Sequence, residues 1–220
     1  MIRPFGEAAL LVEVGDAERA QALAAALASE PIDGVVELVP GLQSVLVELD
    51  PGADATAVES ALAARMERAY AQPAVGRQRI VPVVYGGEHG PDLEEVATLC
   101  GMTPSELAAR HVGLELLVLF GGFAPGFAYL GPLPPELRVP RLATPRTRTP
   151  AGSVAVADAM SGIYPAELPG GWRIIGRTPV TLFDPHRDPP AYLVVGDTVR
   201  FEAISAADWD GSAIAPEDWG

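Results

Sequence analysis

The chain contains no lysine. All 15 of its basic residues are arginine, they face 29 acidic residues, and the formal net charge is −14. Without lysine the chain cannot supply the phosphate-binding lysine of a Walker loop or a lysine that forms a Schiff base. Any phosphate held by this chain must therefore be held by arginine, backbone N–H groups or a metal. The acidic balance also argues against a nucleic acid as partner, because binding to a phosphate backbone requires a basic surface.

Cysteine, histidine and long apolar runs are scarce as well. Cys100 is the single cysteine, which excludes an internal disulfide framework, and three scattered histidines give no metal-ligand spacing, so we expect no metal site. No apolar run reaches the length of a membrane span, and no basic-then-apolar signal pattern opens the sequence. We therefore expect a cytoplasmic protein with no membrane partner. The Gly-x-Ser-x-Gly motif of serine hydrolases is also absent.

The pattern of expected strands and helices indicates two parts of the chain. Residues 1–75 form the first part. Apolar residues recur there at strand and helix spacing, with a turn at Pro40-Gly41 and a possible N-cap at Asp16. The order β-α-β-β-α predicts a small α/β N-terminal domain. Residues 72–76 have the composition of a linker. The expected strands lie at 5–14, 35–39 and 44–49, and the expected helices at 16–29 and 54–70.

Residues 76–205 form the second part. Many short strands with Gly/Pro turns, and few helices, predict a β-barrel-like domain. Residues 206–220 make an acidic tail with two tryptophans, which we interpret as a loose end or an interaction segment. The expected strands lie at 79–85, 114–120, 153–157, 172–175, 180–183, 191–195 and 198–203, and the expected helices at 92–100 and 104–111.

The stretch from Gly121 to Val180 has an unusual composition. It holds ten of the 22 prolines, nine of the 23 glycines and six arginines, with only three acidic residues. Arginines that lie close together repel one another unless something negative sits between them, so this stretch predicts an anion-binding site. The alternative is a solvated edge strand whose arginines block aggregation. The arginines are Arg138, Arg141, Arg146, Arg148, Arg173 and Arg177.

Two further features of the second part could carry chemistry. The loop 121–127 could present backbone N–H groups to an anion, or it could be a tight turn packed by its aromatic residues. His111 ends a predicted helix and could act as a general base or as a donor to a substrate. The alternative for His111 is a favourable interaction with the helix dipole.

A series of motifs resembles the PxpB/KipI family. That family includes the B subunit of bacterial 5-oxoprolinase, proteins labelled allophanate hydrolase subunit 1, and the kinase inhibitor KipI. The chain is also similar to part of the carboxyltransferase domain of urea carboxylase. The motifs, in chain order, are Tyr85-Gly86-Gly87-Glu88, Pro91-Asp92-Leu93, His111, Gly122-Phe123-x-Pro125-Gly126-Phe127-x-Tyr129-Leu130, Pro140-Arg141, Pro145-Arg146, Pro150-Ala151-Gly152-Ser153-Val154, Gly162-Ile163-Tyr164-Pro165 and Pro169-Gly170-Gly171-Trp172-x-x-Ile175-Gly176-Arg177-Thr178-Pro179.

The resemblance implies an α+β chain in which the small N-terminal domain precedes a cyclophilin-like β-barrel. It implies an ATP-dependent opening of the lactam of 5-oxo-L-proline to L-glutamate, with ATP as cosubstrate, with or without Mg²⁺ in the complex. It also implies a hetero-oligomer with a PxpC/KipA-type subunit, with or without a PxpA-type subunit. A KipI-like kinase inhibitor and an allophanate hydrolase or carboxyltransferase-like subunit remain the alternatives.

The resemblance also suggests which residues form the site. We expect Arg141, Arg146 and Arg177 to clamp phosphate or carboxylate groups, and His111 to transfer a proton or contact the substrate. The chain departs from the family pattern at Val112, Leu116, Met160 and Leu168, where the family often has polar residues, and these changes could alter the ligand. The residues expected to bind substrate or anion are Gly122, Phe123, Pro125, Gly126, Phe127, Tyr129, Gly152, Ser153, Tyr164, Gly170, Gly171 and Trp172.

Overall fold

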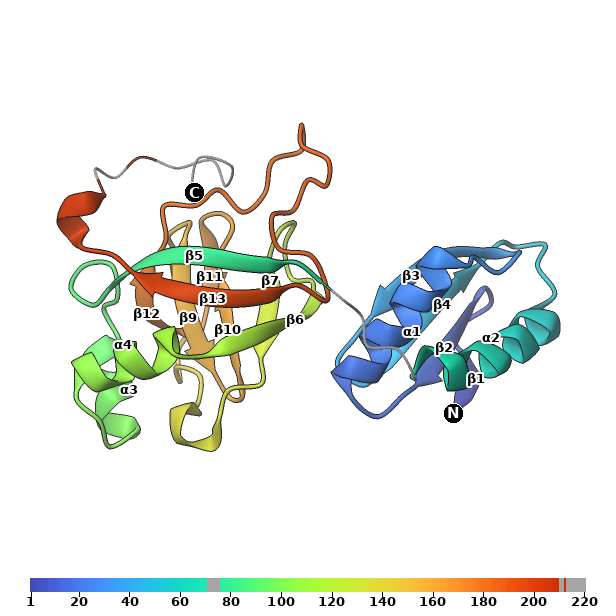
Figure 1. Cartoon of the computed structure of the whole chain (residues 1–220), viewed down its shortest axis with the longest axis horizontal. Coiled ribbons are helices and arrows are strands. Elements are labelled where there is room, and N and C mark those ends of the chain that lie inside the picture. Colours follow the sequence, from blue (N-terminus) through green and yellow to red (C-terminus); the bar gives the residue numbers. More distant parts are fainter. Residues whose placement is uncertain (71–75, 210–211, 213–220) are drawn as a thin grey trace. The chain divides into compact units, whose positions relative to one another are not determined.

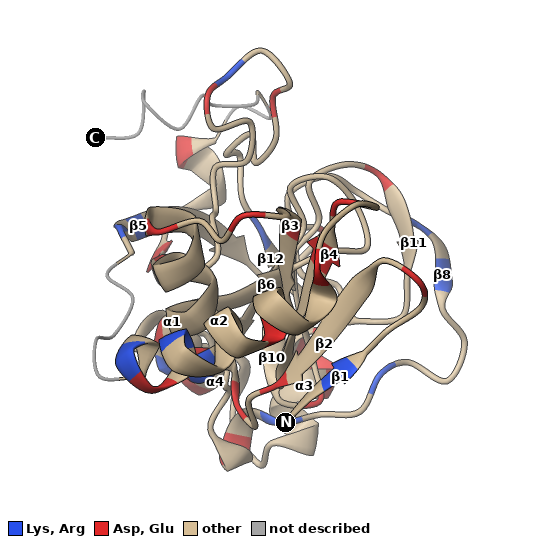
Figure 2. Cartoon of the chain, turned by 90° about the vertical axis from the view of Figure 1, so that its right-hand side faces the viewer, with Lys and Arg blue, Asp and Glu red and all other residues tan. Residues whose placement is uncertain are grey.

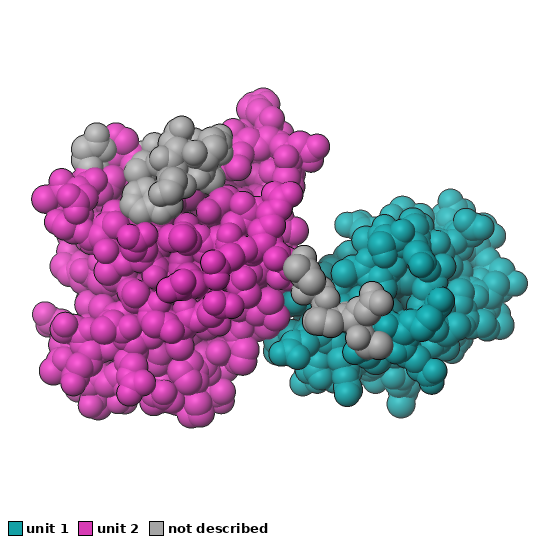
Figure 3. Space-filling model, in the orientation of Figure 1, with its two compact units in different colours: residues 1–75 teal, residues 76–220 magenta. Residues whose placement is uncertain are grey.

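The structure is a computed structural model that describes residues 1–70, 76–209 and 212. The chain forms two compact units, Met1–Val75 and Gly76–Gly220 (Figure 3). Residues 72–75 of the expected linker lie outside the described residues. The same holds for residues 210–220 of the expected tail, apart from Ser212. No described helix is long and apolar enough to cross a bilayer.

The first unit is a four-stranded antiparallel sheet with two helices on one face (Figure 1). Its strand order is β1-β2-β4-β3, so that β1 and β3 are the edges. The side chains of Val12, Val45 and Val47 are fully buried between the sheet and the helices. The elements are β1 (Ile2–Pro4), β2 (Ala9–Glu13), α1 (Ala17–Ser29), β3 (Val35–Pro40), β4 (Ser44–Leu49) and α2 (Ala55–Ala69).

Side-chain caps determine where the two helices begin. The Asp16 carboxylate accepts the N–H of Arg19 at 2.8 Å, and the Asp54 carboxylate accepts the N–H groups of Thr56 and Ala57. Each bond satisfies an amide that has no partner within its helix. Both helices therefore begin where the sequence predicts. The expected strand at 5–14 is partly wrong, because a turn separates β1 from β2.

The second unit contains a closed barrel with strand order β10-β7-β6-β13-β5-β12-β9. β13 and β5 are parallel, and the other strand pairs are antiparallel. Figure 1 shows α3 and α4 beside the barrel, where α3 packs against β12 and α4 against β13. The elements are β5 (Gln78–Tyr85), α3 (Leu93–Leu99), α4 (Pro104–Val112), β6 (Glu115–Gly121), β7 (Ala128–Gly131), η1 (Pro135–Leu137), β8 (Arg146–Thr149), β9 (Ser153–Ala157), β10 (Met160–Ile163), β11 (Leu168–Gly170), β12 (Arg173–Arg177), β13 (Thr198–Ala203) and η2 (Ala206–Asp208).

Strand alternation gives the barrel wall two apolar faces. On β9, Val154 and Val156 point into the barrel, whereas Ala155 and Ala157 point outward beneath a layer of aromatic side chains. Small alanines allow that layer to lie close to the wall. The candidate site is built on this outer face, and the two-stranded sheet β11-β8 lies in the same part of the chain.

Two expected strands are wrong, and several short ones were not expected. Residues 180–183 and 191–195 form no ladder, and their pairing is limited to isolated bridge residues, among them Phe183 with Ala191. Prolines at 179, 185, 189 and 190 remove backbone donors from this segment and prevent a continuous ladder. β7, β8, β10 and β11 each have three or four residues, too few to show a period in the sequence.

Candidate functional site

An aromatic cluster lies on the outer face of the barrel. It consists of Phe127, Tyr129, Tyr164 and Trp172, whose ring centroids lie 4.9 to 5.9 Å apart in edge-to-face arrangements. These distances and angles are those that the quadrupoles of aromatic rings favour. Phe127, Tyr164 and Trp172 are buried, whereas Tyr129 is half-buried and reaches the surface. The cluster is therefore a rigid packed layer with one polar tip that a ligand can reach.

Glycines allow the aromatic rings to pack this closely. A Cβ on Gly162 would lie 3.1 Å from Cζ of Phe127 and 3.2 Å from Cζ3 of Trp172. A Cβ on Gly170 would collide with the hydroxyl of Tyr164, and one on Gly171 would lie 3.6 Å from Pro145. Gly170, expected as a binding residue, thus makes room for the Tyr164 side chain, whereas a Cβ on Gly171 would only reach ordinary van der Waals contact.

Burial and nearby charge determine the protonation of the two tyrosines in the cluster. Burial raises the pKa of Tyr164, although a hydrogen bond from the Trp172 backbone and the positive charges of Arg146 and Arg141 lower it in part. Burial also raises the pKa of Tyr129, against the lowering effect of Arg141. Both phenols are therefore neutral hydrogen-bond donors at neutral pH.

Arg146 is held by a nearly buried carboxylate that sequence reasoning did not single out as a site residue. Its Nη2 lies 2.6 Å from Oδ1 of Asp92, and Nη1 donates to the carbonyl of Trp172 at 3.4 Å. Oδ2 of Asp92 accepts the N–H of Ile174 at 2.6 Å. The Asp92 side chain is only 7% exposed. Arg146 therefore anchors the segment that carries Trp172.

Arg141 is the arginine of this site that can reach a ligand. Its side chain is 58% exposed, its Nε pairs with Asp158 at 3.3 Å, and its guanidinium carbon lies 6.0 Å from the centre of the Trp172 ring. The terminal amino groups make no hydrogen bond to any other described residue. A planar anion beside Trp172 could accept bonds from both groups.

The other arginines of the stretch also have partners. Arg148 pairs with Glu167, Arg173 with Glu95, and Arg138 donates to the carbonyl of Leu133. Figure 2 shows the basic segments along β8 together with acidic segments elsewhere on the chain. Asp92 and Glu95 come from outside the stretch and neutralise part of its charge. The excess of arginine therefore does not by itself require a bound anion, contrary to the sequence argument.

Arg177 lies in a separate cluster. Its Nε donates to the carbonyl of Ala151 at 2.8 Å, and its guanidinium lies 5.3 Å from the ring of Trp209. The ring of Trp209 also lies beside His89, with ring centroids 5.0 Å apart. In the strand register Arg177 lies opposite Ser153, whose buried hydroxyl has no hydrogen-bond partner among the described residues.

The loop 121–127 contains a residue with an unusual backbone conformation. Phe123 adopts a φ of 69°, which is unusual for a bulky residue, and its side chain is 59% exposed. The N–H groups of Gly122, Ala124 and Phe127 bond within the loop. Those of Phe123 and Gly126 have no partner among the described residues and are available to a ligand. Pro125 between them is exposed.

Two glycines expected at the ligand instead face the protein. Gly126 has a φ of 80°, and a Cβ there would lie 2.6 Å from Cβ of Phe183. Its hydrogen therefore faces Phe183, and the expectation that it faces a ligand is wrong. Gly152 has a φ of 79°, and a Cβ there would collide with the carbonyl oxygen of Thr178. Both positions require glycine for reasons of folding.

His111 lies inside the barrel. It is 1% exposed and stacks on Phe201 with ring centroids 4.4 Å apart. Nδ1 lies 2.8 Å from the Tyr85 hydroxyl, and Nε2 lies 3.1 Å from Oγ of Ser161. In this arrangement both ring nitrogens are occupied by protein groups, and a direct contact with substrate has no path.

The hydrogen bonds around His111 specify its tautomer. Ser161 Oγ donates to the carbonyl of Ala155 at 3.2 Å, so Nε2 of His111 must donate to Ser161 and Nδ1 must accept from Tyr85. Burial lowers the pKa of His111 to about 3 and raises that of Tyr85. The imidazole is therefore neutral at physiological pH, which also excludes the helix-dipole interaction of a charged histidine.

The four departures from the family pattern lie in different places. Leu116 belongs to the barrel core, whereas Met160 and Leu168 pack against the aromatic cluster. Val112 is half-buried at the end of α4. Met160 and Leu168 therefore make the surroundings of the aromatic cluster more apolar than polar residues at these two positions would. Among the described residues, no group of His, Cys, Asp or Glu is placed to hold a metal.

Comparison with known proteins identifies relatives along most of the chain. The family described as "Carboxyltransferase domain, subdomain C and D" matches residues 1–193. The B subunit of 5-oxoprolinase from Bacillus subtilis (strain 168) is 38% identical over 226 residues, which cover 94% of each chain. The protein of the same name from Escherichia coli O157:H7 is 41% identical over 204 residues, 90% of this chain and 93% of that protein.

Solved structures show the same fold. TTHA0988 superposes with a TM-score of 0.78 at 34% identity over 94% of this chain, and this chain spans 40% of the length of that protein. The Kluyveromyces lactis urea amidolyase gives a TM-score of 0.73 at 22% identity over 94% of this chain, 15% of the length of that enzyme, which is a likeness of fold. The chain belongs to the carboxyltransferase subdomain C and D family, together with the proteins named as the B subunit of 5-oxoprolinase.

Proposed function

We propose that this chain is the B-type subunit of an ATP-dependent 5-oxoprolinase. With a PxpC-type subunit, and with or without a PxpA-type subunit, it converts 5-oxo-L-proline, ATP and water to L-glutamate, ADP and phosphate. The observation that carries the proposal is the 38–43% identity, over most of this chain, to proteins named as the B subunit of 5-oxoprolinase. Because the reaction consumes ATP, we propose that it takes place in the cytoplasm.

The chemistry of the site agrees with a small cyclic substrate that bears a carboxylate. In this proposal Arg141 binds the carboxylate or a phosphate group, because it is exposed and its terminal amino groups are not engaged by the protein. The half-buried Tyr129 offers a neutral hydroxyl to the ligand. The N–H groups of Phe123 and Gly126 add backbone donors for an oxygen that gains negative charge.

Arg146 and His111 have supporting roles in this proposal. Arg146 positions the Trp172 segment through Asp92, and His111 holds β5 and β10 together inside the barrel. Neither side chain is free to contact a substrate in the described arrangement. Arg177 belongs to the Trp209 cluster, and we assign it no contact with the lactam.

The lactam needs activation because an amide carbonyl is a poor electrophile. In this proposal ATP, with or without Mg²⁺, is the cosubstrate that activates the carbonyl, and the partner subunit completes the site. Since the chain has no lysine, a phosphate that it holds would be held by arginine, by backbone N–H groups or through a metal.

Reconstitution tests the proposed activity. The chain is co-expressed with the PxpC- and PxpA-type subunits of its organism, and glutamate release from 5-oxoproline is followed with and without ATP. We expect turnover only with ATP and only when this chain is present. Unchanged turnover in the preparation that lacks this chain would contradict the proposal, as would independent elution of this chain and the PxpC-type subunit at micromolar concentration.

A further inference from the structure

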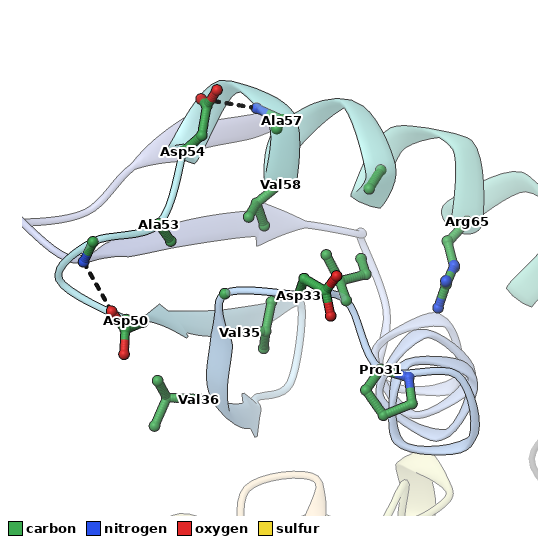
Figure 4. Close-up of a pocket in the computed structure, with 14 residues that line it drawn as sticks. Pro31, Asp33, Val35, Val36, Asp50, Ala53, Asp54, Ala57, Val58 and Arg65 are labelled. Atoms are coloured by element: carbon green, nitrogen blue, oxygen red, sulfur yellow. Dashed lines mark hydrogen bonds between the residues drawn. The ribbon is translucent and has the colours of Figure 1, made fainter.

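An open groove of about 880 Å³ lies in the first unit, far in sequence from the aromatic cluster. It runs between the edge strand β3 and helix α2 (Figure 4). This volume is in the range of ligand and peptide sites. The residues used in the argument are Asp33, Val35, Asp50, Asp54, Ala57 and Val58, all of which line it.

The bottom and one rim of the groove are apolar. Ile32 and Val58 are buried and Val35 is half-buried, and all three belong to the core of this unit. Val36 on the edge strand is 67% exposed, although it is a large apolar residue. Val36 and the groove residues together offer apolar side chains on which an apolar side chain of another chain could pack.

Acidic side chains surround these apolar residues. Asp50 and Asp54 accept only backbone N–H groups, from Gly52 and from the first turn of α2. Asp33 makes no hydrogen bond or ion pair to any described residue. Arg65, the one basic residue of the lining, donates to the carbonyl of Glu30 and lies 3.8 Å from its carboxylate. The lining therefore has three acidic residues and one basic residue, and that basic residue is paired with Glu30 outside the lining.

This negative charge extends over the whole unit. Residues 1–75 contain four arginines and twelve acidic residues, a formal charge of −8 out of the −14 of the chain. A basic occupant therefore complements the groove. The chain's own tail is acidic, and a second copy of the chain would bring a net charge of −14.

The shape of the β3 edge favours recognition by side chains. β3 has a register shift between Val35 and Glu37, and it ends at Pro40, which has no N–H to donate. A bulge and a proline prevent a regular strand from adding to an edge. The occupant therefore inserts side chains into the groove and does not extend the sheet.

We propose that this groove binds an extended segment of the PxpC-type partner subunit that carries arginine or lysine next to apolar residues. The occupant rests on the function proposed above. It agrees with the subunit names of the relatives and with TTHA0988, in which the counterpart of this chain is joined to further polypeptide that makes up most of that protein. The basic side chain pairs with Asp33, which lies between the strand and α2 in Figure 4, and an apolar one packs on Val35, Ala57 and Val58.

Two matched pairs of variants test this surface. Asp33→Arg reverses a charge in the groove, and Glu67→Arg makes the same change on an exposed part of α2 outside it. Ala57→Trp fills the groove, and Ala63→Trp places the same bulk on an exposed position of α2 outside it. Binding of each full-length variant to the purified PxpC-type subunit is measured by calorimetry at two salt concentrations, together with the thermal stability of the variant.

We expect the two groove variants to weaken the Kd by about tenfold or more, with unchanged melting temperatures, and the two control variants to bind like the wild type. Asp33→Arg should also reduce the dependence of the Kd on salt. Wild-type affinity in both groove variants would overturn the proposal, as would a wild-type chain that does not bind the subunit.

Turnover of the wild-type complex separates this proposal from the proposed function. A complex that hydrolyses 5-oxoproline while the groove variants bind normally refutes the groove alone. A wild-type complex that forms, is sensitive to the groove variants and does not release glutamate refutes the function and supports the groove.

Discussion

Replacement of Arg146 by alanine tests whether this arginine supports the fold or contacts the ligand. Its guanidinium lies 2.6 Å from a carboxylate oxygen of Asp92, and the other oxygen accepts the N–H of Ile174 at 2.6 Å. The Asp92 side chain is 7% exposed and that of Arg146 is 29% exposed. Arg146→Ala therefore leaves a nearly buried carboxylate with its backbone hydrogen bond and without its counter-charge.

The expected loss of stability lies between the loss for breaking a buried ion pair and the loss for breaking an exposed one. Removal of one partner of a fully buried pair costs about 3–5 kcal/mol. Water can enter the space left by the partly exposed guanidinium, so we expect a loss of about 1.5–3 kcal/mol, as for a hydrogen bond to a charged group. In a domain of this size the melting temperature would fall by about 3–12 °C.

Arg141→Ala is the matched comparison. Both side chains of the Arg141–Asp158 pair are more than half exposed, so the loss of stability should not exceed about 1 kcal/mol. If Arg141 contacts the anion, kcat/KM of the assembled complex should fall by the equivalent of about 2–5 kcal/mol, roughly 30-fold or more. Arg146→Ala should reduce turnover through the displaced Trp172 segment.

Thermal unfolding of the free subunit and turnover of the assembled complex are measured on the same preparations, with turnover assayed well below the melting temperature. A wild-type melting temperature for Arg146→Ala would refute the argument from the Asp92 carboxylate. Wild-type kcat/KM for Arg141→Ala would remove this arginine from the site.

The remaining predictions concern the loop 121–127 and the barrel interior. Gly126→Ala should lower the melting temperature, because the left-handed backbone costs about 1–2 kcal/mol for a residue with a side chain and the new methyl group meets Phe183. Normal stability combined with lost turnover would show instead that Gly126 faces a ligand. His111→Leu should be less stable than the wild type at pH 7, since Tyr85 and Ser161 lose their partner. Burial lowers the pKa of His111 to about 3, whereas the unfolded chain binds this proton near pH 6.5. Below pH 6.5 the free energy of unfolding of the wild type should therefore fall by about 1 kcal/mol per pH unit, and this fall should be absent in the variant. The difference between their melting temperatures should therefore narrow as the pH falls from 7 to 5, and a constant difference would contradict the neutral buried imidazole.

Elements whose signals are local were predictable from the sequence. The helices α1, α2 and α4 begin at capping residues, and in α4 Thr103 and Glu106 form a capping box. β9 and β13 have the expected bounds because each is a run of residues with strand propensity between turns. β8 and β11 were missed because their pairing with each other, and not their composition, makes them strands.

The residues of the candidate site could be predicted from the sequence, but the placement of their side chains could be predicted less well. The motifs contain Tyr129, Tyr164, Trp172 and Arg141, and the fold brings these residues together. A sequence does not show toward which side of a barrel wall a residue points. His111 was therefore expected to act as a general base or as a donor to a substrate, although its side chain is buried. Asp92 was not recognised as the partner of Arg146. Pro91-Asp92-Leu93 within the motif series was the available signal.

The central claim is that this chain takes part in coupled hydrolysis of 5-oxoproline, and the stoichiometry of the reaction tests it most directly. Glutamate and ADP are quantified in one reaction of the reconstituted complex, with wild-type chain and with Arg141→Ala. The account predicts equal amounts of glutamate and ADP with the wild-type chain, and loss of both with the variant. ADP release without glutamate, or equal product formation by the variant and the wild type, would contradict it.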